Sequence, residues 1–146
     1  MKKILVAACV ACALSAPALA QTMADAQKLF EQYQDMQRNF DPAVAGLYCD
    51  TAVIRKTGTS STGERRTKSL PAPKYKEFIE SAMFLAEETG DYIAYSNVRF
   101  AQEPGGIRIN ADRYSVLKTN SSSVSLLVGS CNGQPAIIEE LSQSHR

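Results

Sequence analysis

Three turn signals divide the last third of the chain, and no other part of the sequence limits the possible folds as strongly. They lie at residues 103–106, at residues 120–122 and at Asn132-Gly133. Asn-Gly is the strongest of them, because a two-residue type I′ turn needs a positive φ at both central residues. The segments between the turns are rich in Tyr, Ile, Val and Leu, and turns this short make neighbouring strands antiparallel. The sequence therefore predicts a four-stranded antiparallel meander with strands at 92–102, 107–118, 124–131 and 135–142.

The length of each turn sets the register, and the register decides which side chains share a face of the sheet. Even-length loops give one mainly apolar face and one mainly polar face. The cross-strand pairs predicted in this way are Phe100 with Ile109, Leu117 with Val124, Leu126 with Glu139 and Val128 with Ile137.

Polar residues on the apolar face are the most informative, because a charge there must be paired or must face a wet cavity. Arg113 and Glu139 would lie two strands apart, about 10 Å at the backbone, which an arginine side chain can reach. Two interpretations stay open: a buried structural ion pair, or the polar floor of a ligand pocket. The pocket predicted in the second case is lined by Arg113, Glu139, Ser96, Ser115, Tyr92 and Tyr33.

The opposite face of the predicted sheet is mostly polar but carries one row of aromatic and aliphatic residues. An exposed row of this kind is typical of a protein interface, such as a homodimer formed through the sheet. Scattered surface apolar residues are the alternative interpretation. The row consists of Tyr95, Tyr114, Leu127 and Ile138.

Residues 1–20 have the features of a secretory signal peptide. Lys2-Lys3 is the positive region, residues 4–14 form the apolar region, and Ala18-Leu19-Ala20 is a small-residue cleavage site. The apolar run is too short to span a membrane. We therefore expect one mature domain at residues 21–146, periplasmic or secreted after cleavage at Ala20, with no transmembrane segment.

Removal of the signal peptide changes the charge and the cysteine content. The loss of Lys2 and Lys3 reduces 16 basic residues to 14 against 15 acidic ones, a net charge of −1. That balance argues against a nucleic-acid partner. Cys49 and Cys131 remain, and an even pair in an oxidising compartment predicts a disulfide, with two free buried thiols as the alternative.

The first half of the mature chain reads mainly as helices. Apolar residues recur every three or four positions over 23–40 and over 74–89, which predicts two long amphipathic helices. A short helix is expected at 42–48 and a first strand at 52–55. Residues 57–73 are rich in Thr, Ser, Gly and Pro, which predicts a loop.

Seven basic residues and one acidic residue lie between Arg55 and Lys76. This basic segment could contact an anionic partner. A solvated mobile loop is the other interpretation, because charge runs usually have that role.

The segment Leu47-Tyr48-Cys49-Asp50-Thr51-Ala52-Val53-Ile54, with the order of the predicted elements, resembles the nuclear transport factor 2-like superfamily and its polyketide-cyclase-like and ketosteroid-isomerase-like members. Cys49 and Thr51 depart from the common pattern. The resemblance implies an α+β fold, in which a cone-like curved mixed or antiparallel sheet packs on two long N-terminal helices. That sheet would comprise the C-terminal meander and an N-terminal strand. The resemblance also implies a pocket at the open end and, in many members, dimers through the sheet.

The chain has few signatures of catalysis. Its one histidine, His145, is the penultimate residue, and no zinc, phosphate-loop or dinucleotide motif occurs, so we expect no metal and no cofactor. A pocket carboxylate could act as a general base, and Glu139 is the candidate, with Tyr92 or Tyr33 as a proton donor. We rank a binding protein for a small anionic or amphipathic ligand first, a dimeric envelope interaction protein second and an acid–base enzyme third.

Overall fold

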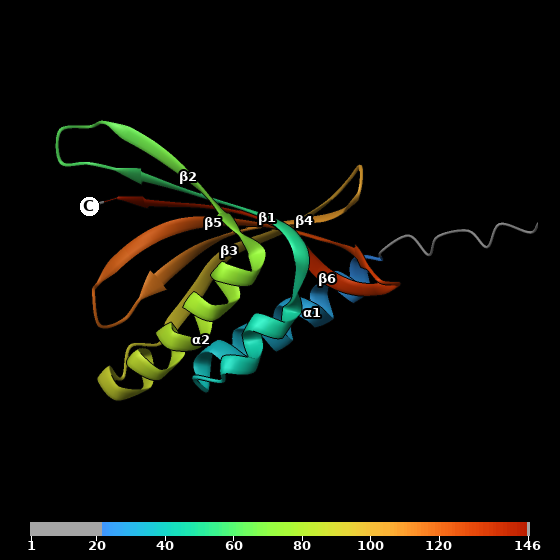
Figure 1. Cartoon of the computed structure of the whole chain (residues 1–146), viewed down its shortest axis with the longest axis horizontal. Coiled ribbons are helices and arrows are strands. Elements are labelled where there is room, and N and C mark those ends of the chain that lie inside the picture. The colour runs from blue at the N-terminus through green and yellow to red at the C-terminus, as the bar shows by residue number, and fades with distance from the viewer. Residues whose placement is uncertain (1–21, 146) are drawn as a thin grey trace, which may run out of the picture.

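The computed structural model describes residues 22–145 of the chain (Figure 1). The predicted signal peptide at 1–20 lies outside the described residues and stays a prediction. Among residues 22–145, no helix is both long and apolar enough to cross a membrane. The elements are α1 (Met23–Arg38), η1 (Pro42–Leu47), β1 (Tyr48–Thr59), β2 (Arg65–Pro71), α2 (Ala72–Thr89), β3 (Ile93–Glu103), β4 (Gly106–Ser115), β5 (Asn120–Cys131) and β6 (Gln134–His145).

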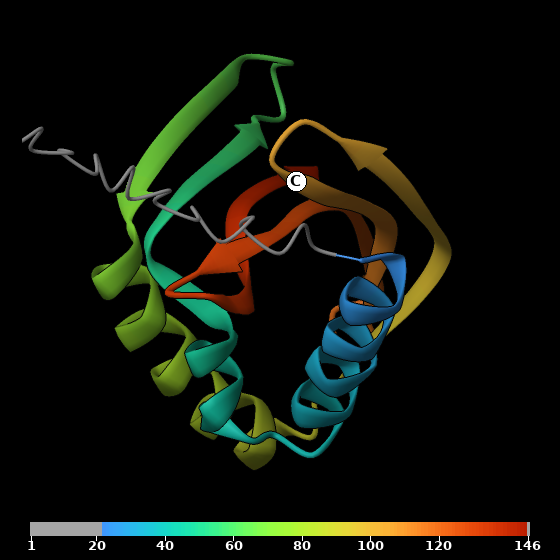
Figure 2. The ribbon, with the colours of Figure 1, turned by 90° about the vertical axis from the view of Figure 1, so that its right-hand side faces the viewer.

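The six strands form one mixed sheet in the order β2-β1-β6-β5-β4-β3. Strands β3 to β6 are the predicted antiparallel meander, and β1 joins it by parallel pairing with β6. Figure 2 shows the curved sheet with α1 and α2 both on its concave side. The predicted α+β architecture is confirmed.

Local sequence signals explain where the helices begin and end. Thr22 and Asp25 form a capping box at the start of α1. Asp41 caps η1, with Pro42 at its first position. Gly90 ends α2 with a φ of 70°, a left-handed conformation that glycine adopts without steric cost.

The loop predicted at 57–73 is wrong for most of its length. β1 continues to Thr59, and residues 65–71 return beside it as the edge strand β2. The Thr57 and Thr67 hydroxyls, 2.8 Å apart, join the two strands. Nearly all of β2 is exposed, so it lacks the alternation of apolar and polar residues by which a half-buried strand is recognised.

Two bulges and one long turn change the predicted register. Phe100 pairs with Ile109 as predicted, but the register of β3 shifts next to Asn97, whose φ is 52°. Ile137 of β6 pairs with Val128 of β5 as predicted. The next residue of β6, Ile138, is an extra residue that shifts the pairing by one position.

Because side chains alternate along a strand, each bulge exchanges the faces of the residues on one side of it. Leu126 consequently pairs with Glu140 and not with Glu139. The predicted pair of Leu117 with Val124 is also wrong, since β4 ends at Ser115 and Leu117 lies in the turn before β5.

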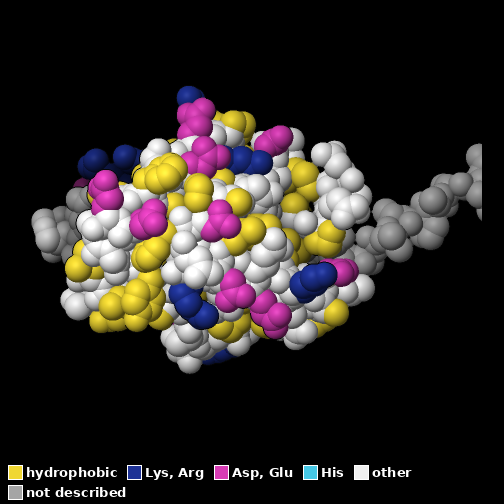
Figure 3. Space-filling model, turned by 90° about the horizontal axis from the view of Figure 1, so that it is seen from below, with side chains coloured by type: hydrophobic (Ala, Val, Ile, Leu, Met, Phe, Trp, Pro, Cys, Tyr) yellow, Lys and Arg dark blue, Asp and Glu magenta, His cyan; other side chains and the backbone are white. Residues whose placement is uncertain are grey.

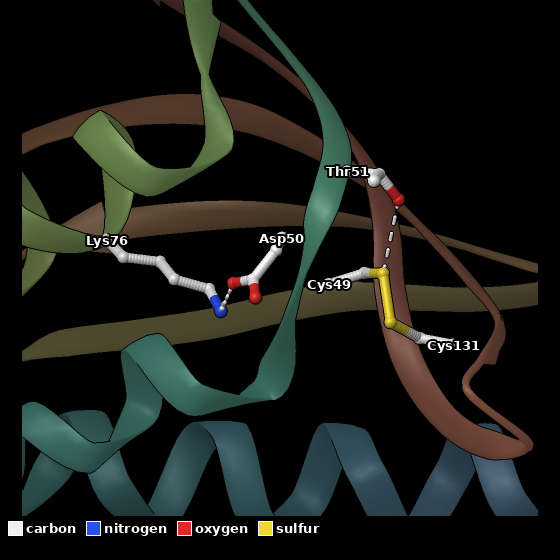
Figure 4. Close-up of a disulfide and its surroundings, with 5 residues drawn as sticks. All are labelled: Cys49, Asp50, Thr51, Lys76 and Cys131. Carbon is white, nitrogen blue, oxygen red and sulfur yellow. Dashed lines mark hydrogen bonds and ion pairs between the residues drawn. A yellow bond between two sulfur atoms is a disulfide. The ribbon is translucent and has the colours of Figure 1, made fainter.

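The predicted disulfide joins Cys49 at the start of β1 to Cys131 at the end of β5 (Figure 4). Next to it, Lys76 of α2 forms an ion pair of 2.6 Å with the exposed Asp50 carboxylate. The disulfide and the ion pair both attach the beginning of β1 to its surroundings. Tyr48, which precedes Cys49, is buried, and its hydroxyl reaches the interior of the molecule.

Candidate functional site

A buried carboxylate lies at the centre of the concave face. Glu140 of β6 is 0 % exposed and accepts hydrogen bonds from the hydroxyls of Tyr48 (2.5 Å) and Tyr75 (2.9 and 3.0 Å). Burial and the Glu140 carboxylate raise the pKa of both tyrosines well above the usual value, so both stay protonated at neutral pH and can donate. Glu140 therefore has hydrogen-bond partners of its own within the core.

A cavity of about 140 Å³ lies beside these tyrosines, between the helices and the sheet. Most of its polar lining comes from Tyr33, Tyr48, Tyr75, Lys56 and Arg113. The Tyr33 hydroxyl lies 3.4 Å from that of Tyr48. The rest of the lining comes from α1, η1, α2 and β3. It is mainly apolar, as the lining of small-molecule sites usually is. Its residues are Gln37, Val44, Phe78, Ile79, Ala82, Met83 and Ile93.

Lys56 brings one positive charge to this cavity. Its ammonium lies 4.5 Å from the centre of the Tyr75 ring and 5.0 Å from that of the Phe78 ring, within the range of cation–π attraction. Burial lowers the pKa of Lys56, and the Glu140 carboxylate opposes that effect. The side chain is thus a partly desolvated cation held against aromatic rings.

Arg113 brings the second positive charge. It lies on the concave face of β4 and donates a hydrogen bond of 3.1 Å from Nε to the hydroxyl of Ser122. Among the described side chains, no carboxylate lies within 4 Å of Lys56 or Arg113. Two cations without a salt bridge therefore line the cavity, and the buried Glu140 carboxylate is bound by two of the tyrosines that also line it.

The basic segment lies on the other side of these two cations. Lys56 and Arg113 also line an open trough of about 500 Å³ beneath the β1–β2 hairpin, together with Arg66 and Lys68. Glu64 lies in the trough as well and forms an ion pair of 3.0 Å with Arg66. The side of the cavity toward the hairpin is consequently polar and mainly cationic.

The structure brings together only part of the predicted pocket. Arg113 and Tyr33 line the same cavity. Ser115 lies next to it and donates hydrogen bonds of 2.8 and 2.9 Å to the Asp91 carboxylate. Ser96 and Tyr92 are exposed, and neither lines the cavity, since the bulge at Asn97 exchanges the faces of this part of β3.

Glu139 does not lie on the predicted face. The bulge at Ile138 turns it to the convex side, where its carboxylate forms an ion pair of 2.7 Å with Arg108. Arg108 also binds Glu103, at 2.5 Å. The interpretation in which Arg113 pairs with Glu139 is therefore wrong, and Glu140 lies on the concave face in place of Glu139.

The predicted interface row also has a different geometry. Tyr95 points to the concave side, where it donates a hydrogen bond of 2.5 Å to Gln37, and its ring packs on those of α1. Leu127 is buried, Ile138 packs over Gly129, and only Tyr114 is exposed, at 39 %. These four residues form no exposed apolar row, and a homodimer through the sheet stays an untested prediction.

The comparisons with known proteins agree with the fold. No protein-family model and no curated protein matches the sequence. An NTF2-like protein of unknown function from Pseudomonas putida KT2440 is 11% identical, with a TM-score of 0.61 over 83% of this chain and 84% of that one. A second such protein, from Shewanella oneidensis MR-1, is 12% identical, with a TM-score of 0.60 over 83% and 98%.

A third structure, an NTF2-like protein with a cystatin-like fold from Novosphingobium aromaticivorans, has a TM-score of 0.56 at 9% identity, over 82% of this chain and 79% of that one. The chain has the nuclear transport factor 2-like fold. At these identities the likeness concerns the fold alone, and this fold carries many unrelated functions. The function of this chain has to be argued from its own cavity.

Proposed function

We propose that this protein binds a small amphipathic anion in the cavity between its helices and the sheet. The observation that carries the proposal is the pair of cations, Lys56 and Arg113, that line a mainly apolar cavity without a carboxylate within 4 Å among the described side chains. Glu140 is already bound by Tyr48 and Tyr75. An anionic group of a ligand would supply the partner that the two cations lack.

We further propose that binding takes place in the periplasm or outside the cell, after cleavage at Ala20. The sequence features of residues 1–20 support export. The Cys49–Cys131 disulfide supports it independently, because disulfides persist mainly in oxidising compartments.

The anion 8-anilinonaphthalene-1-sulfonate is a suitable probe, because its fluorescence rises when it enters an apolar site. We expect it to bind the mature protein, and Lys56→Met or Arg113→Met to weaken binding about ten- to hundredfold, the value of a hydrogen bond to a charged group. The matched control is Arg99→Met, which removes an exposed cation from β3 that does not line the cavity. Fluorescence titration measures all four affinities.

Equal affinities of the wild type, Lys56→Met and Arg113→Met would overturn the proposal, provided that circular dichroism shows all three to be folded. A loss of affinity in Arg99→Met as large as in the other two would also contradict it. Net charge, and not the cavity, would then govern the binding.

The lowered pKa of Lys56 predicts a dependence of binding on pH. The anion binds the protonated amine of Lys56. Its affinity is therefore highest below the pKa of Lys56 and falls as the pH rises through that pKa. Because burial lowers that pKa, the fall should begin at a lower pH than the ordinary lysine value of 10.5 implies. Fluorescence titrations at increasing pH should show this fall in the wild type.

Lys56→Arg serves as the control for this pH dependence, since arginine keeps its proton throughout the range. Its affinity should stay constant where that of the wild type declines. A parallel decline in both proteins would assign the effect to another group and contradict the role of Lys56.

An acid–base enzyme is less well supported. Glu140 replaces Glu139 as the buried carboxylate, but Glu140 does not line the cavity, whereas its partners Tyr48 and Tyr75 do. Both hydroxyls donate to the carboxylate, so a bound molecule would not reach the base directly.

A further inference from the structure

Part of the apolar stripe of α2 is not buried in the core. Tyr75 and Ile79 are buried, but Phe78 is 58 % exposed and Leu85 is 62 % exposed. Leu117, in the turn after β4, is 56 % exposed. Figure 3, which views the helical side, shows apolar side chains gathered at the end where the C-terminal part of α2 lies.

These exposed side chains line a groove of about 450 Å³ between α2 and the β3–β4 side of the sheet. Leu85 and Leu117 lie in its outer part, and Phe78, Met83 and Ile93 line both the groove and the cavity. The groove therefore continues from the cavity that contains Lys56 and Arg113. Residues 78–89 of α2 extend over about 16 Å at the rise of an α-helix.

We infer that the ligand is an anionic amphiphile with an unbranched hydrocarbon chain, such as a fatty acid. Its head binds Lys56 and Arg113, and its chain runs along α2 between Leu85 and Leu117. This inference rests on the proposed function, because it takes the two cations as the anion site. It adds the chemical class of the ligand and the path of its apolar part.

The sizes of the cavity and the groove, and the charges around them, favour a ligand with a long hydrocarbon chain over a compact ligand. A cavity of about 140 Å³ is smaller than the sites of roughly 300 Å³ or more that enclose compact ligands. The apolar part of an amphiphile must therefore leave the cavity. Toward the hairpin it would meet Arg66 and Lys68, whereas along α2 it meets mainly apolar side chains.

The test is the competition of carboxylates of increasing chain length with the fluorescent sulfonate on the mature protein. A fully buried methylene raises affinity about fourfold, and in an open groove we expect about twofold for each. Laurate has six more methylenes than hexanoate, so it should bind about sixtyfold more tightly. Leu85→Ser should weaken laurate about fivefold or more and leave hexanoate unchanged.

Phe84→Ser is the matched control. Phe84 lies next to Leu85 on α2 and is as exposed, at 61 %, but lines neither the groove nor the cavity. We expect the Phe84→Ser variant to bind laurate as tightly as the wild type does. Both substitutions are at exposed positions of the helix, so neither is expected to prevent folding.

The outcomes separate the chain from the anion site. Suppose that hexanoate binds and that Lys56→Met weakens its binding, but that laurate binds no more tightly than hexanoate. The inference is then wrong and the proposed function stands. If laurate binds more tightly but Leu85→Ser and Phe84→Ser affect it equally, the chain does not follow the groove and the inference is again wrong. If no carboxylate competes and the sulfonate binds Lys56→Met unchanged, the proposed function itself fails.

Discussion

Glu140→Ala is expected to lower the free energy of unfolding by about 3–5 kcal/mol, since it removes the acceptor of two buried hydroxyls and each hydrogen bond to a charged group contributes about 1.5–3 kcal/mol. Tyr48 and Tyr75 would lose their partner in the core. The substitution also leaves a cavity where the side chain is fully buried. Urea denaturation followed by circular dichroism measures the change.

Glu139→Ala is the matched control, because it removes the same side chain from the adjacent position. Glu139 lies on the convex face, and its partner Arg108 keeps Glu103 as a second partner, so we expect a cost of about 1 kcal/mol or less. Equal costs for the two substitutions, or a larger cost at Glu139, would contradict the bulge at Ile138 and the location of the buried carboxylate.

Replacing Cys49 and Cys131 together with alanine is expected to lower the free energy of unfolding by about 4.5 kcal/mol. The disulfide closes a loop with a sequence separation of 82, and the chain-entropy model gives this value for a loop of that length. For a domain of this size the melting temperature should fall by roughly 10–20 °C. Differential scanning calorimetry of the oxidised wild type and the double variant measures the fall.

Reduction of the wild type provides an independent check of the same bond. A reducing agent should bring the wild type close to the melting temperature of the double variant and leave the variant itself unchanged. A melting temperature that responds in neither experiment would mean that the two cysteines are not joined in the protein or do not constrain its unfolded state.

The order of the elements could be predicted from the sequence because local signals determine it. Asn132-Gly133 has the two positive φ angles of the predicted turn, 52° and 78°, and the capping residues begin and end the helices near the predicted positions. The disulfide followed from the compartment that the first 20 residues imply. These features depend on a few neighbouring residues and need no tertiary information.

The site could be predicted only in part because the face of a strand depends on every bulge along it. Neither Ile138 nor Asn97 belongs to a sequence pattern that marks an extra residue, yet these two bulges turn Glu139 outward and Tyr95 inward. Arg113 was assigned to the correct face, since β4 has no shift of register.

The sequence did not reveal four residues at or beside the site, which are Glu140, Tyr48, Tyr75 and Lys56. The two tyrosines are separated from Glu140 by 92 and 65 residues, so no local pattern connects them. Lys56 lies beyond the predicted end of the first strand, where the pairing of β1 with β2 and β6 extends the strand. A helix stripe likewise does not reveal which part a tertiary contact will cover, and Phe78 and Leu85 remain exposed.

Native mass spectrometry can show whether the protein binds an anionic amphiphile at Lys56 and Arg113. The sample is residues 21–146, exported to the periplasm and purified without detergent or reducing agent. We expect a protein whose mass is two hydrogens below the reduced value and which carries an anionic amphiphile, either from the cell or after incubation with laurate. The adduct should be much less abundant in Lys56→Met and unchanged in Arg99→Met. A wild-type protein that stays empty in the presence of laurate, or an adduct that is equally abundant in both variants, would contradict this expectation.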